Sequence, residues 1–66
     1  LLAICAQVIL LYIEDSASKG ELPVTLETLG VALLSRGIES DELVEALEWL
    51  LEQGSISEIA ENEFIL

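Results

Sequence analysis

The sequence predicts a small, mainly α-helical domain that ends in a β-hairpin. Three segments repeat Leu, Ile and Ala at the three-and-four spacing of a helix. Gly, Pro and Ser separate these segments, and residues 55–66 combine short apolar runs with a polar turn. The chain has 66 residues, which is the size of one small domain. Folding of a domain this small buries only roughly 60% of the surface that the unfolded chain exposes.

The first predicted helix covers residues 1–14 and is apolar nearly all round. A helix of this kind is covered on more than one side. Residues 15–21 are predicted as a loop, because Ser, Lys and Gly cluster there and the hydrophobic period lapses. A short edge strand is expected at residues 22–24, where apolar residues flank Pro23.

The second predicted helix covers residues 25–36, with Thr25 as its N-cap and Gly37 suited to its left-handed end. Its expected core face consists of apolar residues and one glycine: Leu26, Leu29, Gly30, Leu33 and Leu34. A glycine in the middle of a helix is unfavourable, so Gly30 predicts that another helix crosses closely at this point.

The third predicted helix covers residues 41–53, with Ser40 as its N-cap and Gly54 at its end. Its expected core stripe consists of Leu43, Ala46, Leu47, Leu50 and Leu51. Residues 55–66 then form the predicted hairpin. Its turn is placed at Glu61 and Asn62, because Asn tolerates the left-handed conformation.

The predicted order is helix, short strand, helix, turn, helix and two-stranded hairpin. In this order the segments LPVTLETLGVALLSRGI, ESDELVEALEWLLEQGSI and SEIAENEFIL resemble a winged helix-turn-helix domain, with residues 55–66 as the wing. The run ALEWLLEQGSI is similar to the junction of helix, glycine and strand in that superfamily. Among its members, the chain is reminiscent of C-terminal modules of replication protein A's middle subunit and of the minichromosome maintenance helicases. The resemblance implies a protein-docking or regulatory role.

The charge of the chain bears on its partners. Thirteen acidic residues face two basic ones, Lys19 and Arg36, for a formal charge of −11. Affinity for duplex DNA comes largely from Lys and Arg side chains that displace counterions. A chain this acidic is repelled from nucleic acid and from anionic lipid. We therefore expect a protein partner with a basic or apolar surface, and no membrane contact.

The third helix is the element that would enter the major groove in a DNA-binding relative. At about 100° per residue, four carboxylates fall opposite its core stripe: Asp41, Glu45, Glu48 and Glu52. They are either a solvated face or a docking face for a basic partner. Trp49 lies at the edge of this face, where it is either an interface anchor or packed under the hairpin or first helix. Direct binding of duplex DNA through this helix is not expected.

The first helix carries more apolar side chains than one small core can bury. The candidates for contact with a second copy or with a host protein are Leu1, Ile4, Val8, Leu11 and Tyr12. The apolar run is shorter than the roughly 20 residues that span a bilayer, although a shortened membrane segment is an alternative.

No residue pattern for catalysis, cofactor binding or metal binding is predicted. The chain has no His, a single Cys and no glycine-rich phosphate loop. Cys5 has no partner for an internal disulfide, which favours the cytoplasm or nucleus. The sequence thus predicts a non-enzymatic protein-interaction module, part of a larger protein or assembly linked to replication, transcription or chromosome machinery. The alternative is a DNA-binding transcriptional regulator whose basic contacts lie outside this segment.

Overall fold

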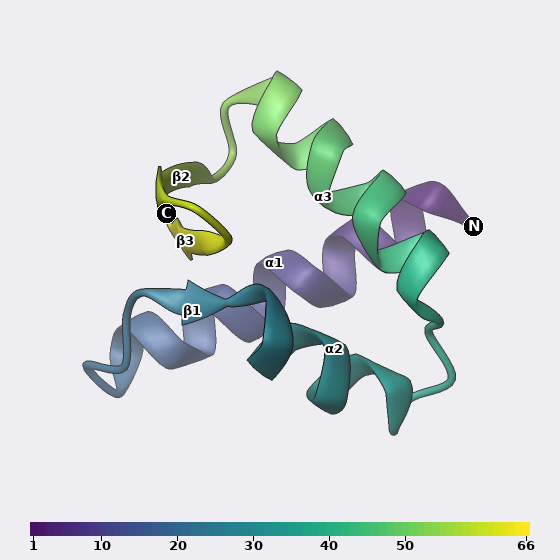
Figure 1. Cartoon of the computed structure of the whole chain (residues 1–66), viewed down its shortest axis with the longest axis horizontal. Helices are drawn as coiled ribbons and strands as arrows, with labels where there is room; N and C mark the ends of the chain where they lie inside the picture. Colours follow the sequence, from purple (N-terminus) through teal and green to yellow (C-terminus); the bar gives the residue numbers. More distant parts are fainter.

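Three helices and a small antiparallel sheet make up the fold (Figure 1). The computed structural model describes every residue from 1 to 66. In chain order the elements are α1 (Leu2–Ser18), β1 (Val24–Thr25), α2 (Leu26–Leu34), α3 (Ser40–Gln53), β2 (Ser57–Ala60) and β3 (Glu63–Ile65). The prediction of a mainly helical chain with a small β-sheet is confirmed.

Helix α1 is longer than the sequence indicated, because it continues to Ser18 instead of ending at residue 14. The prediction of a loop from residue 15 was therefore wrong. Ser16 is buried against the rest of the fold. The Nζ atom of Lys19 lies 3.0 Å from Asp15 Oδ2, four residues earlier. Burial of Ser16 thus accounts for the extension of the helix past the point where its hydrophobic period lapses, and the exposed Lys19–Asp15 pair adds little.

Strand β1 leads directly into helix α2. The strand begins at Val24 instead of residue 22, because Pro23 has no N–H to donate to a ladder. Thr25 is both the last strand residue and the N-cap of α2, as predicted. Its Oγ1 accepts a hydrogen bond from the N–H of Thr28 at 3.1 Å.

Helix α2 ends at Leu34, two residues before the predicted end at residue 36. The N–H of Ile38 donates to the carbonyl of Leu33 at 3.0 Å, across Gly37 with its φ of 83°. This hydrogen bond ends the helix in a turn in which Gly37 is left-handed. The chain therefore leaves the helix earlier than the apolar pattern suggested.

Helix α3 begins one residue earlier than predicted, so Ser40 lies inside the helix and Glu39 is the N-cap. The N–H of Glu39 donates to Glu42 Oε1 at 3.0 Å. This is the hydrogen bond of a capping box in which the side chain of the third helical residue accepts from the backbone of the N-cap. The helix ends as predicted at Gly54, which has a φ of 76° and donates to the carbonyls of Leu50 and Leu51.

The sheet has the strand order β1-β3-β2, and both pairs are antiparallel. Val24 pairs with Phe64 in the first ladder, and Glu58 pairs with Phe64 in the second. The predicted hairpin turn is confirmed, since Asn62 adopts a φ of 60°. The N–H of Leu26 donates to the Asn62 carbonyl at 2.9 Å, which ties the start of α2 to the hairpin.

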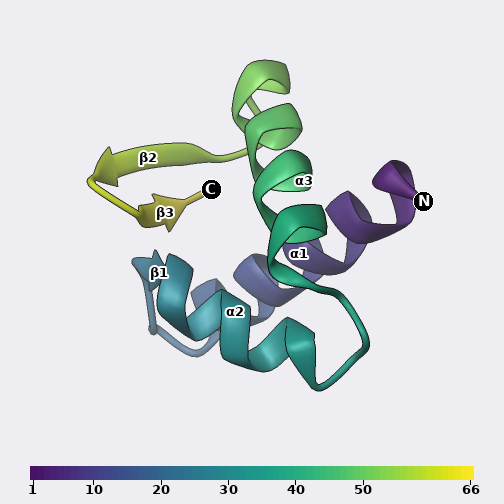
Figure 2. The ribbon, with the colours of Figure 1, turned by 45° about the vertical axis from the view of Figure 1, so that its right-hand side comes forward.

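One apolar cluster holds the elements together. Helix α3 lies across α1, and the sheet closes one end of the molecule (Figures 1 and 2). The buried apolar residues are Cys5, Ala6, Ile9, Ile13, Val24, Leu29, Leu33, Leu43, Ala46, Leu47, Leu50, Ile56 and Phe64. Their burial leaves one face each of α1, α2 and α3 in contact with solvent.

Candidate functional site

The outward face of α3 is strongly acidic. All four carboxylates predicted for this face are exposed: Asp41, Glu45, Glu48 and Glu52. The helix folds this way because its apolar residues recur at helical spacing, which turns the intervening acids outward. No Lys or Arg lies in the helix.

Two large side chains border this acidic face. Val44 is exposed and borders a depression between α3 and the hairpin, together with Glu48 and Glu58. Trp49 is 40% exposed and borders a second depression, beside Ala3, Gln7 and other residues of α1. Trp49 therefore lies at the junction of α1 and α3, with part of its ring available for contact.

The hairpin adds further negative charge beside α3, although one carboxylate has a structural role. Every residue of β2 is exposed, whereas Phe64 of β3 is buried. Glu58 Oε2 accepts a hydrogen bond from the N–H of Asn62 at 2.7 Å. Glu58 thus stabilises the turn, while Glu61 is exposed and Glu63 is half-buried.

Helix α1 presents an apolar stripe beside its core-facing side, where Val8 packs against the edge of the core. Leu1, Ile4 and Leu11 are exposed, with Leu1 at 92%, and Val8 is half-buried between them. Their spacing of three and four residues places these side chains in one line along the helix. Tyr12 differs from the other candidates, because it borders a depression beside α2 at the edge of the stripe.

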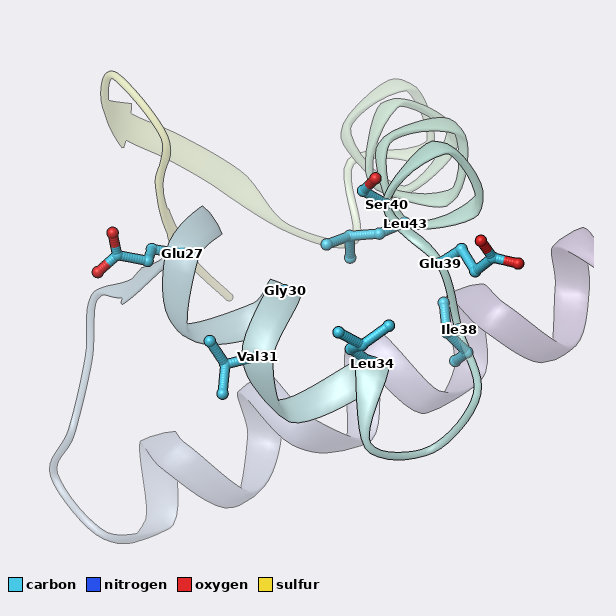
Figure 3. A pocket seen from close by; sticks show the side chains of 8 residues that line it. All are labelled: Glu27, Gly30, Val31, Leu34, Ile38, Glu39, Ser40 and Leu43. Carbon is cyan, nitrogen blue, oxygen red and sulfur yellow. The ribbon is translucent and has the colours of Figure 1, made fainter.

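A groove separates α2 from the start of α3 (Figure 3). It has a volume of about 360 Å³, near the lower end of the range for ligand pockets. Its lining residues are Glu27, Gly30, Val31, Leu34, Ile38, Glu39, Ser40 and Leu43.

The apolar lining of the groove is open to solvent. Val31 is 71% exposed and Leu34 is 63% exposed. The prediction that Leu34 belongs to the core was therefore wrong, because the early end of α2 and the turn of the chain leave it on the rim. Gly30 also lacks the predicted close crossing: a Cβ atom there would meet only Leu43 Cδ2, at 4.0 Å.

Sequence reasoning missed this groove, although part of the signal was present. At about 100° per residue, Val31 lies far round the helix from the buried Leu29 and Leu33. It could have been recognised as an outward apolar residue. Ile38 and Glu39 line the same groove because of the path of the turn between α2 and α3. The hydrophobic period of a single helix carries no information about that path.

The two cations are Lys19, which follows α1, and Arg36, which lies in the turn between the groove residues Leu34 and Ile38. Lys19 is bound to Asp15, and the hydrogen bond to that carboxylate, together with its charge, raises the pKa of Lys19. Arg36 is exposed in the turn after α2 and makes no ion pair.

Comparisons with protein-family models, curated proteins and solved structures found no match. No group of three or more His, Cys, Asp or Glu side chains is arranged to hold a metal ion. None of the helices combines the length and the apolar character needed to cross a bilayer.

Proposed function

We propose that the chain is a non-enzymatic protein-docking module of the winged-helix type. The observation that carries this proposal is the outward face of α3, where Asp41, Glu45, Glu48 and Glu52 are all exposed. In a DNA-binding winged helix the corresponding face approaches phosphates, which four carboxylates would repel. A basic protein surface would instead be attracted to it, with the largest effects on association rate and specificity.

The order of elements supports the winged-helix part of the proposal. Helices α2 and α3 follow each other through a short turn, and β2 and β3 form a hairpin directly after α3. Strand β1 pairs with β3, which joins the start of α2 to this hairpin. By resemblance, the module belongs to replication, transcription or chromosome machinery. We assign it to the cytoplasm or nucleus, where the buried thiol of Cys5 stays reduced.

Affinity capture with the immobilised full chain tests the docking function. Wild-type chain should retain protein partners from a cell extract, and Trp49→Ala should retain less of them, because a partly exposed Trp is a typical interface anchor. Ile59→Ala is the control, since Ile59 is exposed on β2 and lines neither depression beside α3. Equal capture by Trp49→Ala and wild type would remove Trp49 from the interface.

A mobility-shift assay with duplex DNA at low salt tests the alternative of a DNA-binding regulator. Low salt favours any electrostatic complex, so it gives DNA binding its best chance. We expect no shifted complex at micromolar chain. A complex at micromolar or tighter affinity would overturn the proposal that this face excludes DNA.

A second surface supports self-association. We propose that two copies pair through the stripe of Leu1, Ile4, Val8 and Leu11 on α1. Residues 1–13 contain no charged side chain, so the stripe itself adds no charge repulsion between two chains of charge −11. Sedimentation should show a dimer that Ile4→Ser abolishes and Ile59→Ser preserves. A wild-type monomer at high concentration would contradict the dimer.

A further inference from the structure

The groove between α2 and α3 is used by neither of these surfaces. Figure 3 shows Val31 and Leu34 on α2, with Ile38 and Leu43 across the space from Leu34. Val31 and Leu34 are three residues apart, so they form one ridge along the helix. These side chains are 71% and 63% exposed, so a partner that covers them stabilises the complex by removing their apolar area from water.

Carboxylates mark both ends of this apolar surface. Glu27 and Glu39 lie at opposite ends of the groove in Figure 3, and their side chains point outward. Neither is held in an ion pair, because the only ion pair of the chain joins Lys19 and Asp15. An apolar middle with an acid at each end is complementary to an apolar segment flanked by cations.

The backbone around the groove favours a helical occupant. Addition of a strand needs unpaired backbone groups at a sheet edge, and the wall formed by α2 offers side chains instead. An amphipathic helix presents apolar residues at three-and-four spacing, which fit the ridge of Val31 and Leu34.

We propose that this groove binds an amphipathic basic helix of a partner protein. Apolar side chains of the partner lie against Val31, Leu34 and Ile38, and Lys or Arg side chains lie beside Glu27 and Glu39. This inference rests on the proposed docking function and names the class of partner. A second copy does not fit, because its cations are Lys19, already paired with Asp15, and Arg36 alone.

Fluorescence anisotropy with a defined peptide tests the inference. The probe is a labelled Leu/Ala/Lys peptide of about 16 residues, long enough to form a helix, with Leu on one face and Lys at both ends. It is titrated with the full chain at low salt. Two comparison peptides carry Glu in place of Lys, or Ala in place of Leu. Only the Lys/Leu peptide should bind.

Three single variants locate the binding site. Leu34→Ser and Val31→Ser should each weaken binding about tenfold, as expected when an apolar anchor is truncated. Their control is Ile59→Ser, a change at another exposed apolar residue, on β2, that should leave binding unchanged. All three side chains are exposed, so the variants should fold, and circular dichroism checks this.

The charge contribution has its own control. The double variant Glu27→Gln and Glu39→Gln should weaken binding about threefold at low salt and less at high salt. The double variant Glu48→Gln and Glu52→Gln removes as much charge from the outward face of α3 and should have a smaller effect.

The outcomes separate the groove from the docking function. Binding that is insensitive to Leu34→Ser, or equal binding of the Glu peptide, overturns the groove proposal. If affinity instead depends on Glu48 and Glu52, the α3 face binds the partner and only the groove assignment fails. If no peptide binds while affinity capture depends on Trp49, the groove assignment also fails alone. Absence of both peptide binding and capture overturns both proposals.

Discussion

Helices α2 and α3 are neighbours in the chain but turn opposite kinds of surface to solvent. Both bury leucines in the common core, such as Leu29 of α2 and Leu50 of α3. Outside the core, α3 exposes mainly a row of carboxylates, whereas α2 exposes the more open apolar side chains, with Val31 at 71% and Leu34 at 63% against 44% for Val44 and 40% for Trp49 of α3. The two helices thus share one kind of inner face and differ in what they offer to a partner.

This difference assigns different physical roles to the two faces. Water solvates the carboxylates of α3, so that face is stable without any cover and acts mainly on association rate and specificity. Each Å² of exposed apolar area on α2 that a partner removes from water stabilises the complex by about 25 cal/mol. We therefore expect α3 to attract the partner and the groove beside α2 to supply most of the affinity.

The largest effects should come from the inner faces, where the helices are alike. Leu29→Ala and Leu50→Ala should each lower the free energy of unfolding by about 2–5 kcal/mol, because both side chains are fully enclosed. Urea denaturation followed by circular dichroism measures this. A much smaller loss for Leu29→Ala would mean that α2 is only loosely held to the core and that the inner faces of the two helices are not alike.

Gly30→Ala should raise the stability of α2. An alanine Cβ at this position meets only Leu43 Cδ2 at 4.0 Å, an ordinary van der Waals distance. Relief of the glycine penalty inside a helix should add about 0.5–1 kcal/mol to the free energy of unfolding, which thermal denaturation detects as a higher Tm. Gly54→Ala is the control and should lower the Tm, because Gly54 has a φ of 76°.

Reversal of one charge on α3 should raise the free energy of unfolding by less than Gly30→Ala does. Glu48 and Glu52 are four residues apart on the exposed face, and such like-charge pairs are destabilising. Glu48→Lys replaces this repulsion with attraction and should stabilise the chain by about 0.5 kcal/mol at low salt. Thermal denaturation in about 1 M salt should show almost no gain. A destabilised variant would indicate that Glu48 has a structural role that its exposure does not suggest.

The smallest effect is expected at Lys19, at the end of α1. The contact with Asp15 raises the pKa of Lys19, so its stabilising effect is fully present below the unfolded pKa and disappears as the pH rises through the folded value. Both side chains are exposed, which screens the interaction. Lys19→Met should therefore leave the Tm nearly unchanged at pH 7. A large drop would show that the end of α1 depends on this pair.

The features that depend on local chemistry could be predicted from the sequence. Thr25 caps α2 and Gly54 ends α3, because these residues satisfy backbone groups within one turn. The hairpin turn at Asn62 has the same local cause. The acidic face of α3 could also be placed, since the period of one long helix determines it.

The features that depend on two elements could not be predicted. The extension of α1 to Ser18 follows from burial of Ser16 against the core. Leu34 was assigned to the core because its spacing fits a helix, but the turn that ends α2 moves it to the rim of the groove. The groove itself joins α2 to the start of α3, and its shape is set by the path of the chain between them.

A direct competition between a basic helix and duplex DNA tests whether this chain binds proteins through its acidic and apolar surfaces. The labelled Lys/Leu peptide and a labelled duplex are each titrated with the full chain in the same low-salt buffer. We expect micromolar binding of the peptide that unlabelled duplex does not displace, and no binding of the duplex. Micromolar binding of the duplex, with displacement of the peptide, would contradict it.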